Sequence, residues 1–473
     1  MMRLTKSEWS VIGATLVGAA LRLYQLGTPS LWADEASTYL FASLPFRTAL
    51  TAMVYDAVHP PLFYFIERVV LMVTHAEFGL RWPSAMAGIV AIPLVAQWAR
   101  ALSQRPAGLW VAWWLALNPF AVWYAREARN YSLSLCLTLV LAWMFAALYR
   151  RPTRLRWIAF IGLSALAYLT HYFTALFPLA CALLLISRLR HDPVFFRHWM
   201  LAQLAAAALA SPWFILWAIS PVRSFGIEYI SRPGLSDLPL TLFNLATGWS
   251  EAWRPSVMVS GALWLGGLAL GWRGRAWPHP RWRLMALLWI LAPLLAVFAF
   301  SLKRPVYLDR FFIILLPPLL LLAALGFRAG PRVWRVGGPV LLAASLGWTS
   351  LTYLTPPTAA KEDWRGAVAF LRENAPSVEA IRLLILPDWV STHYYGLDLA
   401  DVGQQPEALP PDFWLVVHDP RASAHRLTPF DPPIIIEDVK TLTNWLASSG
   451  YTIQERRNFV GVVLLRVTRS SDS

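Results

Sequence analysis

Residues 61–75, PLFYFIERVVLMVTH, decide how the chain is threaded through a membrane. A helix that spans a bilayer needs roughly 20 apolar residues, whereas this stretch is shorter and carries Glu67 and Arg68 near its centre. A charge at the middle of the bilayer costs roughly 2.5–3.5 kcal/mol even on lenient insertion scales. The stretch therefore predicts an interfacial helix that lies along the membrane surface and does not cross it.

Apolar runs long enough to cross a membrane lie on both sides of this stretch. Hydrophobic residues make up 57% of the chain and charged residues 14%, against roughly 45–50% and about 25% in soluble proteins. A soluble fold has no interior large enough for that excess, so the composition excludes one for most of the chain. Eleven segments are predicted to span the membrane: 9–26, 82–102, 107–124, 131–149, 155–171, 172–187, 199–219, 256–272, 283–301, 310–327 and 334–353.

The distribution of positive charge predicts the orientation of these spans. Arginine clusters lie at 100–105, 150–156, 188–190, 273–283 and 328–335. If 61–75 does not span, all of them fall on one side, which the positive-inside rule makes the cytoplasmic side. The first span follows Arg3 and Lys6, as in an uncleaved signal-anchor. We therefore expect a multi-pass protein of a bacterial-type cell (inner) membrane, with its N-terminus in the cytoplasm and its C-terminus outside.

The net charge of +14 is a property that nucleic-acid-binding proteins also have, so nucleic acid is considered as a partner. No basic stripe alternates with exposed aromatic residues, and the arginines sit between apolar runs, where membrane topology explains them. The sequence therefore favours membrane lipids over nucleic acid as partners. The two cysteines, Cys136 and Cys181, both lie inside apolar runs, so the sequence predicts no disulfide framework and no cysteine-based metal site.

The chain changes character after about residue 355. Helices are predicted at 361–374 and 438–449, strands at 382–386 and 412–417, and one or two closing strands at 451–467. Alternating helices and short apolar strands are typical of an α/β domain. The predicted fold class is thus a polytopic α-helical membrane protein, with a transmembrane domain at 1–354 and a small extracytoplasmic α/β domain at 355–473.

Two groups of polar residues fall in the first outer loop. Asp34 and Glu35, in WADEA at 32–36, can supply a general base or bind a divalent ion with one oxygen each. They equally fit the acidic residues that favour the first turn of a helix. His59 is held in place by the two prolines that follow it, although a histidine beside prolines is more often an ordinary loop residue.

Two further groups lie at the outer ends of later spans. Residues 126–131, REARNY, place three charges between apolar helices, which is expensive unless they are paired or functional. Positive charge on the outer face favours a phosphate or carboxylate partner, against a solvated turn in which an arginine neutralises Glu127. Residues 303–310, KRPVYLDR, are likewise basic, and Arg310 at the mouth of a span can reach a lipid phosphate. His171, at a hinge between spans, is expected to be structural.

Carboxylates and guanidinium groups at the outer leaflet suit the transfer of a group from a lipid phosphate to an acceptor outside the cytoplasm. The absence of a glycine-rich phosphate loop from the sequence favours a lipid-linked donor over a nucleotide sugar. A membrane transporter or lipid flippase is the alternative, but it predicts inverted repeats and ionisable residues near the bilayer midplane. A non-catalytic scaffold would leave the outer acids and arginines unexplained.

Several motifs, in their order and spacing, resemble one family. They are LWADEA (31–36), HPPLFYF (59–65), LRWPSAMAG (80–88) and NPFAVWYAREARNYSL (118–133). They are similar to the GT-C class of integral-membrane glycosyltransferases, in the bacterial branch related to protein O-mannosyltransferases, aminoarabinose transferases and lipopolysaccharide-core galacturonosyltransferases. The resemblance covers about residues 1–190, is fainter over 304–326, and is absent as a specific motif from the C-terminal region.

The resemblance implies an inverting enzyme that uses a polyprenyl-phosphate sugar as donor. Asp34 is then the general base and Glu35 its partner. Arg129 is the best match to an arginine that contacts the donor phosphate in the mannosyltransferases, with Arg126 as the alternative. His59 stands where the aminoarabinose transferases have lysine, which makes it a further candidate for that phosphate.

Other residues complete the predicted site. Arg310 is a further ligand of the donor phosphate, and Glu127, Tyr131 and His171 are supporting residues. Metal use varies within the class, so a divalent metal ion stays open as a cofactor. The acceptor is expected to be a glycan, a lipid or a protein.

Overall fold

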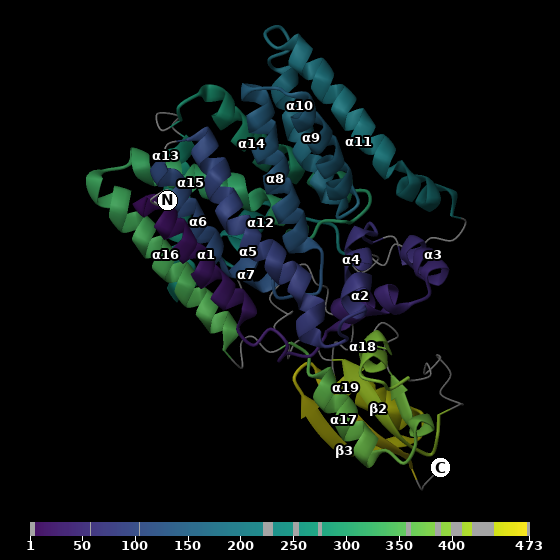
Figure 1. Ribbon diagram of the computed structural model, residues 1–473. Helices are drawn as coiled ribbons and strands as arrows, with labels where there is room; N and C mark the ends of the chain where they lie inside the picture. The colour runs from purple at the N-terminus through teal and green to yellow at the C-terminus, as the bar shows by residue number, and fades with distance from the viewer. Residues whose placement is uncertain are drawn as a thin grey trace.

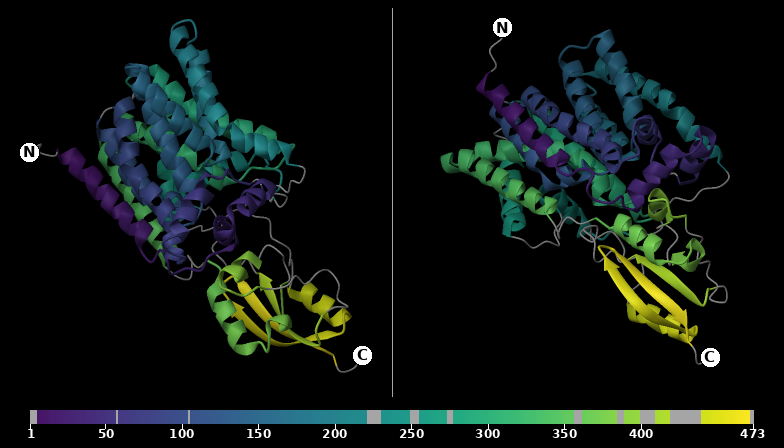
Figure 2. Two further views of the ribbon diagram at one scale, coloured as in Figure 1. Left: turned by 45° about the vertical axis from the view of Figure 1, so that its right-hand side comes forward. Right: turned by 60° about the horizontal axis from the view of Figure 1, so that its bottom comes forward.

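The computed structural model describes residues 5–56, 58–103, 105–220, 230–248, 255–272, 277–355, 361–383, 389–398, 409–418 and 439–470. A bundle of helices makes up the larger part, and a small sheet with its own helices lies beyond one end of the bundle (Figures 1 and 2). The N-terminus lies toward the other end of the bundle (Figure 1).

Each of the eleven apolar segments contains at least one helix. The bundle comprises α1 (Lys6–Leu23), α5 (Glu77–Leu102), α6 (Arg105–Leu117), α7 (Pro119–Tyr124), α8 (Tyr131–Arg150), α9 (Arg154–Tyr168), η1 (Tyr172–Ala175), α10 (Leu176–Ile186), α11 (Pro193–Ile219), α13 (Pro255–Trp272), α14 (Pro280–Ser301), η2 (Asp309–Leu315), α15 (Leu316–Ala329) and α16 (Arg332–Leu354). Within the described residues, five helical stretches are long and apolar enough to cross a membrane: Glu77–Leu102, Tyr131–Arg150, Pro193–Ile219, Pro280–Ser301 and Asp309–Ala329. The protein is therefore a polytopic helical membrane protein, and the count of eleven spans stays a prediction.

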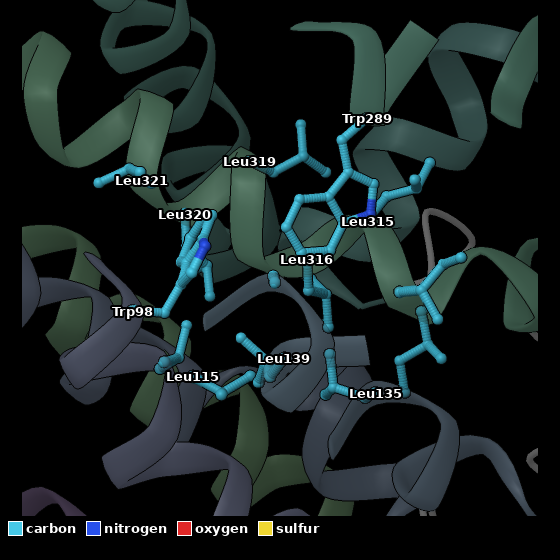
Figure 3. Packing of buried hydrophobic residues seen from close by; sticks show 14 of the residues in the cluster. Trp98, Leu115, Leu135, Leu139, Trp289, Leu315, Leu316, Leu319, Leu320 and Leu321 are labelled. Atoms are coloured by element: carbon cyan, nitrogen blue, oxygen red, sulfur yellow. The ribbon is translucent and has the colours of Figure 1, made fainter. Parts of the chain in front are cut away.

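The centre of the bundle is the almost wholly buried helix α15. Its leucines pack against Trp98 of α5, Trp289 of α14 and Leu139 of α8 (Figure 3). Helices α13 and α15 approach so closely that a Cβ added at Gly326 would lie 1.7 Å from the carbonyl oxygen of Gly267. Small residues commonly allow such backbone approach in membrane bundles, where dispersion packing replaces the hydrophobic effect between helices.

The predicted first outer loop forms three short helices, α2 (Ala33–Ser43), α3 (Phe46–Asp56) and α4 (Leu62–Leu71). Helix α4 has 10 residues, which gives it a length of about 15 Å and makes it too short for a bilayer core of about 30 Å. Arg68 donates hydrogen bonds to the carbonyl oxygens of Ala42 and Leu44, at 3.2 and 2.6 Å, and so caps the C-terminal end of α2. The prediction that 61–75 does not form a spanning helix thus agrees with the length of α4, and its placement on the membrane surface stays a prediction.

The C-terminal region folds around a four-stranded sheet in the order β1-β2-β4-β3. Its elements are α17 (Trp364–Asn374), η3 (Val378–Ala380), β1 (Ile381–Leu383), α18 (Trp389–Tyr394), β2 (Asp412–His418), α19 (Val439–Ser448), β3 (Tyr451–Phe459) and β4 (Val462–Arg469). Strands β1 and β2 are parallel, and the other two pairs are antiparallel. Successive side chains of a strand point to opposite faces. Accordingly, Trp414 and Val416 join the core under α17, whereas Phe413 and Leu415 join the core under α19.

One more helix, α12 (Asp237–Thr247), lies in the predicted outer loop 220–255. Its Asn244 donates a hydrogen bond of 3.1 Å to Asp309 at the start of η2, and its Thr241 hydroxyl lies 2.9 Å from the Tyr307 hydroxyl. Helix α12 therefore fixes the turn that leads into Arg310.

Candidate active site

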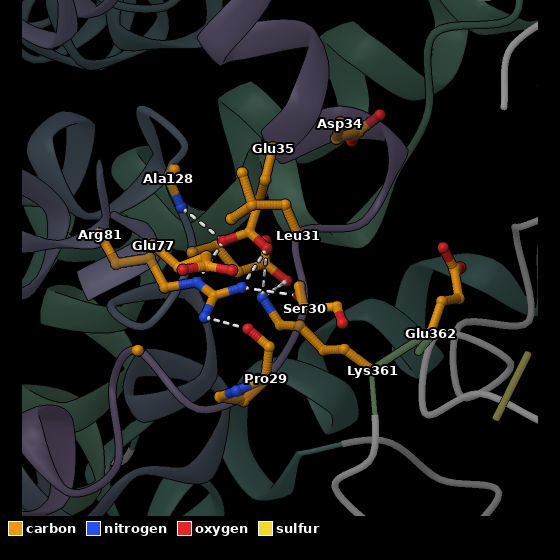
Figure 4. Close-up of polar contacts among 12 residues, drawn as sticks. Pro29, Ser30, Leu31, Asp34, Glu35, Glu77, Arg81, Ala128, Lys361 and Glu362 are labelled. Carbon is orange, nitrogen blue, oxygen red and sulfur yellow. Dashed lines mark hydrogen bonds and ion pairs between the residues drawn. The ribbon is translucent and has the colours of Figure 1, made fainter. Parts of the chain in front are cut away.

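Four segments far apart in the sequence meet at the end of the bundle that faces the sheet. They are the N-terminal turn of α2, the turn 125–130 between α7 and α8, the start of η2, and Lys361 just before α17. Asp34 and Glu35 are adjacent in the first turn of α2, but their side chains point in different directions (Figure 4). The two predicted catalytic carboxylates therefore stand in different surroundings.

Asp34 faces two arginines. Its Oδ2 lies 3.8 Å from Nη2 of Arg129 and 3.9 Å from Nη2 of Arg310. The Asp34 side chain is 29% exposed, whereas those of Arg129 and Arg310 are 7% and 6% exposed. Both separations exceed the hydrogen-bond range of about 2.7–3.2 Å, so the pairing is electrostatic. Arg129 is oriented by hydrogen bonds to the carbonyl oxygen of Asp34 and to the hydroxyl of Thr38, at 3.1 and 3.2 Å.

Glu35 is fully buried, and both of its carboxylate oxygens are bonded. Nε and Nη2 of Arg81 donate one hydrogen bond of 2.7 Å to each oxygen. The Ala128 amide donates to Oε1 at 2.9 Å and the Lys361 ammonium to Oε2 at 3.1 Å (Figure 4). Burial alone would raise the pKa of Glu35, but the charges of Arg81 and Lys361 outweigh it and lower the pKa to about 2. Glu35 is thus an ionised anchor that ties α2 to the turn at Ala128.

Glu127 is also buried, but it is less fully paired. Its Oε1 lies 3.6 Å from the Lys361 ammonium, and within the described residues neither carboxylate oxygen has a hydrogen-bond partner. Burial raises the pKa of Glu127 to about 7, against the opposing charges of Lys361 and Arg310. The carbonyl oxygen of Glu127 accepts a hydrogen bond of 2.7 Å from the Arg129 amide, so this residue also shapes the turn that carries Arg129.

His59 and His171 stand beside the arginine pair. Their ring centroids lie 5.1 Å apart, and Tyr131 packs on both at 6.0 and 6.1 Å. Burial, together with the charges of Arg129 and Arg310, lowers the pKa of His59 well below its usual range and that of His171 to about 3. Both rings are therefore neutral at pH 7. His171, expected to be structural, has its Nδ1 occupied by the Phe173 amide at 3.1 Å.

Arg126 does not contact this cluster but the end of α1. Its Nη1 donates to the carbonyl oxygens of Leu21, Arg22 and Tyr24, at 3.2, 3.2 and 2.5 Å, and so caps the C-terminal end of α1. Of the two arginines in REARNY, the structure brings only Arg129 to Asp34 and Arg310. Lys303 and Arg304, at the other end of the KRPVYLDR turn, are exposed.

Sequence reasoning missed three contributors to the site. Arg81 lies in the quoted motif LRWPSAMAG, but nothing marked it as the partner of Glu35. Lys361 comes from the C-terminal region, 326 positions from Glu35 along the chain. Asp56, at the end of α3, lies near Asp34 and Arg129, and burial raises its pKa to about 6. Spacing alone gives no signal for such contacts, because each depends on how the loops fold back on one another.

The carboxylates do not fit the divalent site that Asp34 and Glu35 could have formed together. Both oxygens of Glu35 are held by cations and an amide, so only Asp34 of that pair points outward. Among the residues that the structure describes, no group of three or more His, Cys, Asp or Glu side chains could hold a metal ion.

The helical bundle, with the acids of the first loop and two arginines at one end, has the fold of the GT-C class of membrane glycosyltransferases, which confirms the resemblance seen in the motifs. The family model described as dolichyl-phosphate-mannose-protein mannosyltransferase matches residues 58–217. No curated protein matches the sequence.

Solved structures align with most or nearly all of the chain. ArnT from Cupriavidus metallidurans in the apo state has 15% identity and a TM-score of 0.63, over 96% of this chain and 97% of that one. The same protein bound to undecaprenyl phosphate gives a TM-score of 0.62 at 15% identity, over 98% of each chain. The Archaeoglobus fulgidus oligosaccharyltransferase in the apo form gives 0.55 at 13% identity, over 87% of this chain and 69% of that one. At these identities the likeness establishes the fold, and together with the family match it supports a glycosyltransferase.

Proposed function

We propose that the protein is an inverting glycosyltransferase that moves a sugar from a polyprenyl-phosphate donor to an acceptor on the extracytoplasmic face of the membrane. The observation that carries this proposal is the pair Arg129 and Arg310, buried side by side against Asp34 at the end of an apolar bundle. Guanidinium groups are well suited to phosphate. The bound undecaprenyl phosphate of the similar ArnT structure supports the same class of donor.

In the proposed reaction the acceptor hydroxyl attacks the anomeric carbon as the bond from that carbon to the phosphate oxygen breaks. Asp34 takes the proton of the hydroxyl, and the phosphate leaves with the bonding electron pair. Arg129 and Arg310 stabilise the charge that develops on the leaving phosphate, because fixed cations in a dry site need no reorganisation during the reaction. Asp34, partly exposed where Glu35 is not, is the carboxylate of the pair that an acceptor can reach.

The two buried histidines are neutral, which is compatible with a phosphate site whose positive charge comes from the two arginines. His59 and His171 line the region beside both arginines. Their neutral rings add no charge to the site but keep ring nitrogens that can exchange hydrogen bonds with phosphate or sugar oxygens. For this reason we assign His59 to the donor side, with Tyr131 and His171 packed behind it.

Lipid analysis of a strain that lacks the gene tests the proposal. The polyprenyl-phosphate sugar that serves as donor should accumulate, and the corresponding sugar should disappear from one envelope glycan, lipid or protein. Complementation with the parent chain should restore both, whereas complementation with Asp34→Asn should restore neither. Unchanged polyprenyl-phosphate sugars together with unchanged glycans would overturn the proposal.

A further inference from the structure

The segment Lys361–Arg365, KEDWR, joins the C-terminal region to the first outer loop through alternate residues. Lys361 donates to Glu35. Asp363 accepts a hydrogen bond of 3.3 Å from the Ser30 hydroxyl. Arg365 pairs with Glu77 at 2.5 Å. The odd-numbered side chains of this segment therefore hold the C-terminal region against the membrane part.

The residues between them belong to the C-terminal region itself. Trp364 is fully buried in the core under α17, and its indole N–H donates to Glu362 at 2.8 Å. Glu362 also lies 3.0 Å from Nε2 of His418 at the end of β2. The folding of the C-terminal region therefore fixes where Lys361 points.

Lys361 also balances the charge of the buried cluster. Glu35 and Glu127 are two buried carboxylates, and in the described part of the chain Arg81 and Lys361 are the cations within 4 Å of them. Once Glu127 is ionised, removal of the ammonium would leave Arg81 as the one such cation for two carboxylates. Breaking a buried pair by removal of one partner is strongly destabilising, because it leaves an uncompensated charge.

The same cluster holds the turn that carries Arg129. The Ala128 amide donates to Glu35, and the Arg129 amide donates to the Glu127 carbonyl oxygen. Of the two carboxylates that Lys361 contacts, that of Glu35 accepts a hydrogen bond from this turn, and that of Glu127 is carried by the turn itself. The next side chain of the turn, Arg129, reaches Asp34. Loss of the charge at Lys361 would therefore act on the proposed donor site through the turn 127–129.

We propose that Lys361 is a positioning residue of the proposed transferase site, through which the docked C-terminal region holds the turn 127–129 and so the guanidinium of Arg129 in place. The inference rests on the proposed function for the meaning of the site, but the contact network stands apart from it. The C-terminal region would then be a working part of the site, and its undocking would disable donor binding.

The pH dependence provides a specific signature. The titratable and charged groups that face Glu127 are Lys361, Glu35, Arg310, Asp34, Tyr124 and Tyr131. Burial already raises the pKa of Glu127 to about 7 with Lys361 in place, and loss of the ammonium raises this pKa further. In a Lys361→Met variant, Glu127 therefore keeps its proton to a higher pH while the C-terminal region is docked than after it has undocked. Docking of the variant thus weakens, relative to docking of the parent, as the pH rises above about 7.

Hydrogen exchange at the Ala128 amide measures this docking without any substrate. In Lys361→Met we expect the protection of peptides spanning 126–131 to fall, relative to the parent, by roughly tenfold more at pH 8.5 than at pH 6.5, since each pH unit between the two pKa values contributes up to a factor of ten. The intrinsic pH dependence of exchange is removed by comparison with the parent at the same pH. The affinity for undecaprenyl phosphate should weaken in the same direction.

Paired variants separate charge balance from simple misfolding. Lys361→Arg, which keeps the charge, and the double variant Lys361→Met with Glu127→Gln, which removes the uncompensated carboxylate, should both restore protection at pH 8.5. The matched control is Lys303→Met, which removes an exposed lysine and should behave as the parent. If Lys361→Met does not fold, the double variant must recover the fold for the proposal to stand.

Parent-like protection in Lys361→Met at pH 8.5, or no rescue by Glu127→Gln, would overturn the inference. If the parent itself binds no undecaprenyl phosphate, the donor assignment of the proposed function fails, while the exchange data still decide whether Lys361 positions the turn.

Discussion

The imidazole of His59 lies against that of His171, with ring centroids 5.1 Å apart, in a buried space next to the guanidinium groups of Arg129 and Arg310. Two protonated rings at that separation would repel each other and both arginines. The site therefore keeps both histidines neutral, and its positive charge comes from guanidinium groups, whose charge does not change over the physiological pH range.

This relationship predicts that donor binding does not need a protonated histidine. Because burial and the neighbouring arginines lower the pKa of both rings, the affinity for undecaprenyl phosphate should not rise as the pH falls from 7.5 to 5.5. Binding isotherms of the parent and of His59→Gln across this range provide the measurement. A rise in affinity centred near pH 6.5 that His59→Gln abolishes would contradict the prediction.

The arginine pair should determine donor affinity. Arg129→Ala and Arg310→Ala should each raise the KM for donor, because each removes a cation from the proposed phosphate site. The expected loss of binding free energy is roughly 1.5–3 kcal/mol per charged hydrogen bond lost. Arg304 is exposed and lies six residues before Arg310 along the same turn, so Arg304→Ala serves as the control and should keep the parent KM. A variant that binds donor as tightly as the parent would remove that arginine from the assignment.

Asp34→Asn keeps the shape of the side chain and removes the base. We expect kcat to fall by at least about 100-fold with donor binding nearly intact, since a positioned general base contributes typically 10²–10⁴ in rate. Glu35→Gln should act differently, because it breaks the buried pair with Arg81: its main effect should be a lower melting temperature. Near-normal turnover by Asp34→Asn would exclude this residue as the base.

Asp56 should make the folded state less stable as the pH rises. Its folded pKa, raised by burial to about 6, exceeds the ordinary value of about 3.9, so the folded state binds the proton more tightly and loses stability between about pH 4 and 6. Asp56→Asn should therefore be more stable than the parent at pH 7.5, by roughly 1–3 kcal/mol, and no more stable at pH 4. Thermal unfolding at both pH values tests this. If the variant instead loses turnover without gaining stability, Asp56 has a part in the chemistry.

Membrane topology is open to direct measurement. Thr28 and Arg190 are exposed and lie on opposite predicted sides, and both native cysteines are buried. Single cysteines at these two positions should therefore react with a membrane-impermeant maleimide from opposite sides of the membrane. Labelling of both positions from outside would rule out the predicted orientation.

The bundle could be predicted from the sequence because its helices lie in continuous apolar runs. The run 107–124 shows the limit of this method: Asn118 and Pro119 divide it into α6 and α7, with the Asn118 side chain capping the second helix at the Ala121 amide. The elements after residue 360 were also visible, because short apolar strands alternate there with amphipathic helices. Hydropathy does not give the number of crossings, since helices such as α9 and α10 are shorter than a full span.

The site was only partly readable. Asp34 stood out as one of two adjacent carboxylates in the first loop. Arg129 and Arg310 stood out because positive charge on the predicted outer face favours a phosphate or carboxylate partner. The same argument could not separate Arg126 from Arg129, because which of them turns inward depends on the backbone of one tight turn. Nor could it give Glu35 its role, because its partners Arg81 and Lys361 come from other segments.

The alternating contacts of KEDWR limit how this architecture can be recombined. A single residue inserted between Glu362 and Asp363, just before α17, would move Lys361 away from Glu35 and bring the acidic Glu362 into its place. A chimaera that imports a C-terminal region from a relative must therefore import matching first-loop and 127–129 residues as well. The C-terminal region and the membrane part are joined by contacts that match residue by residue, so neither can be exchanged as an independent module.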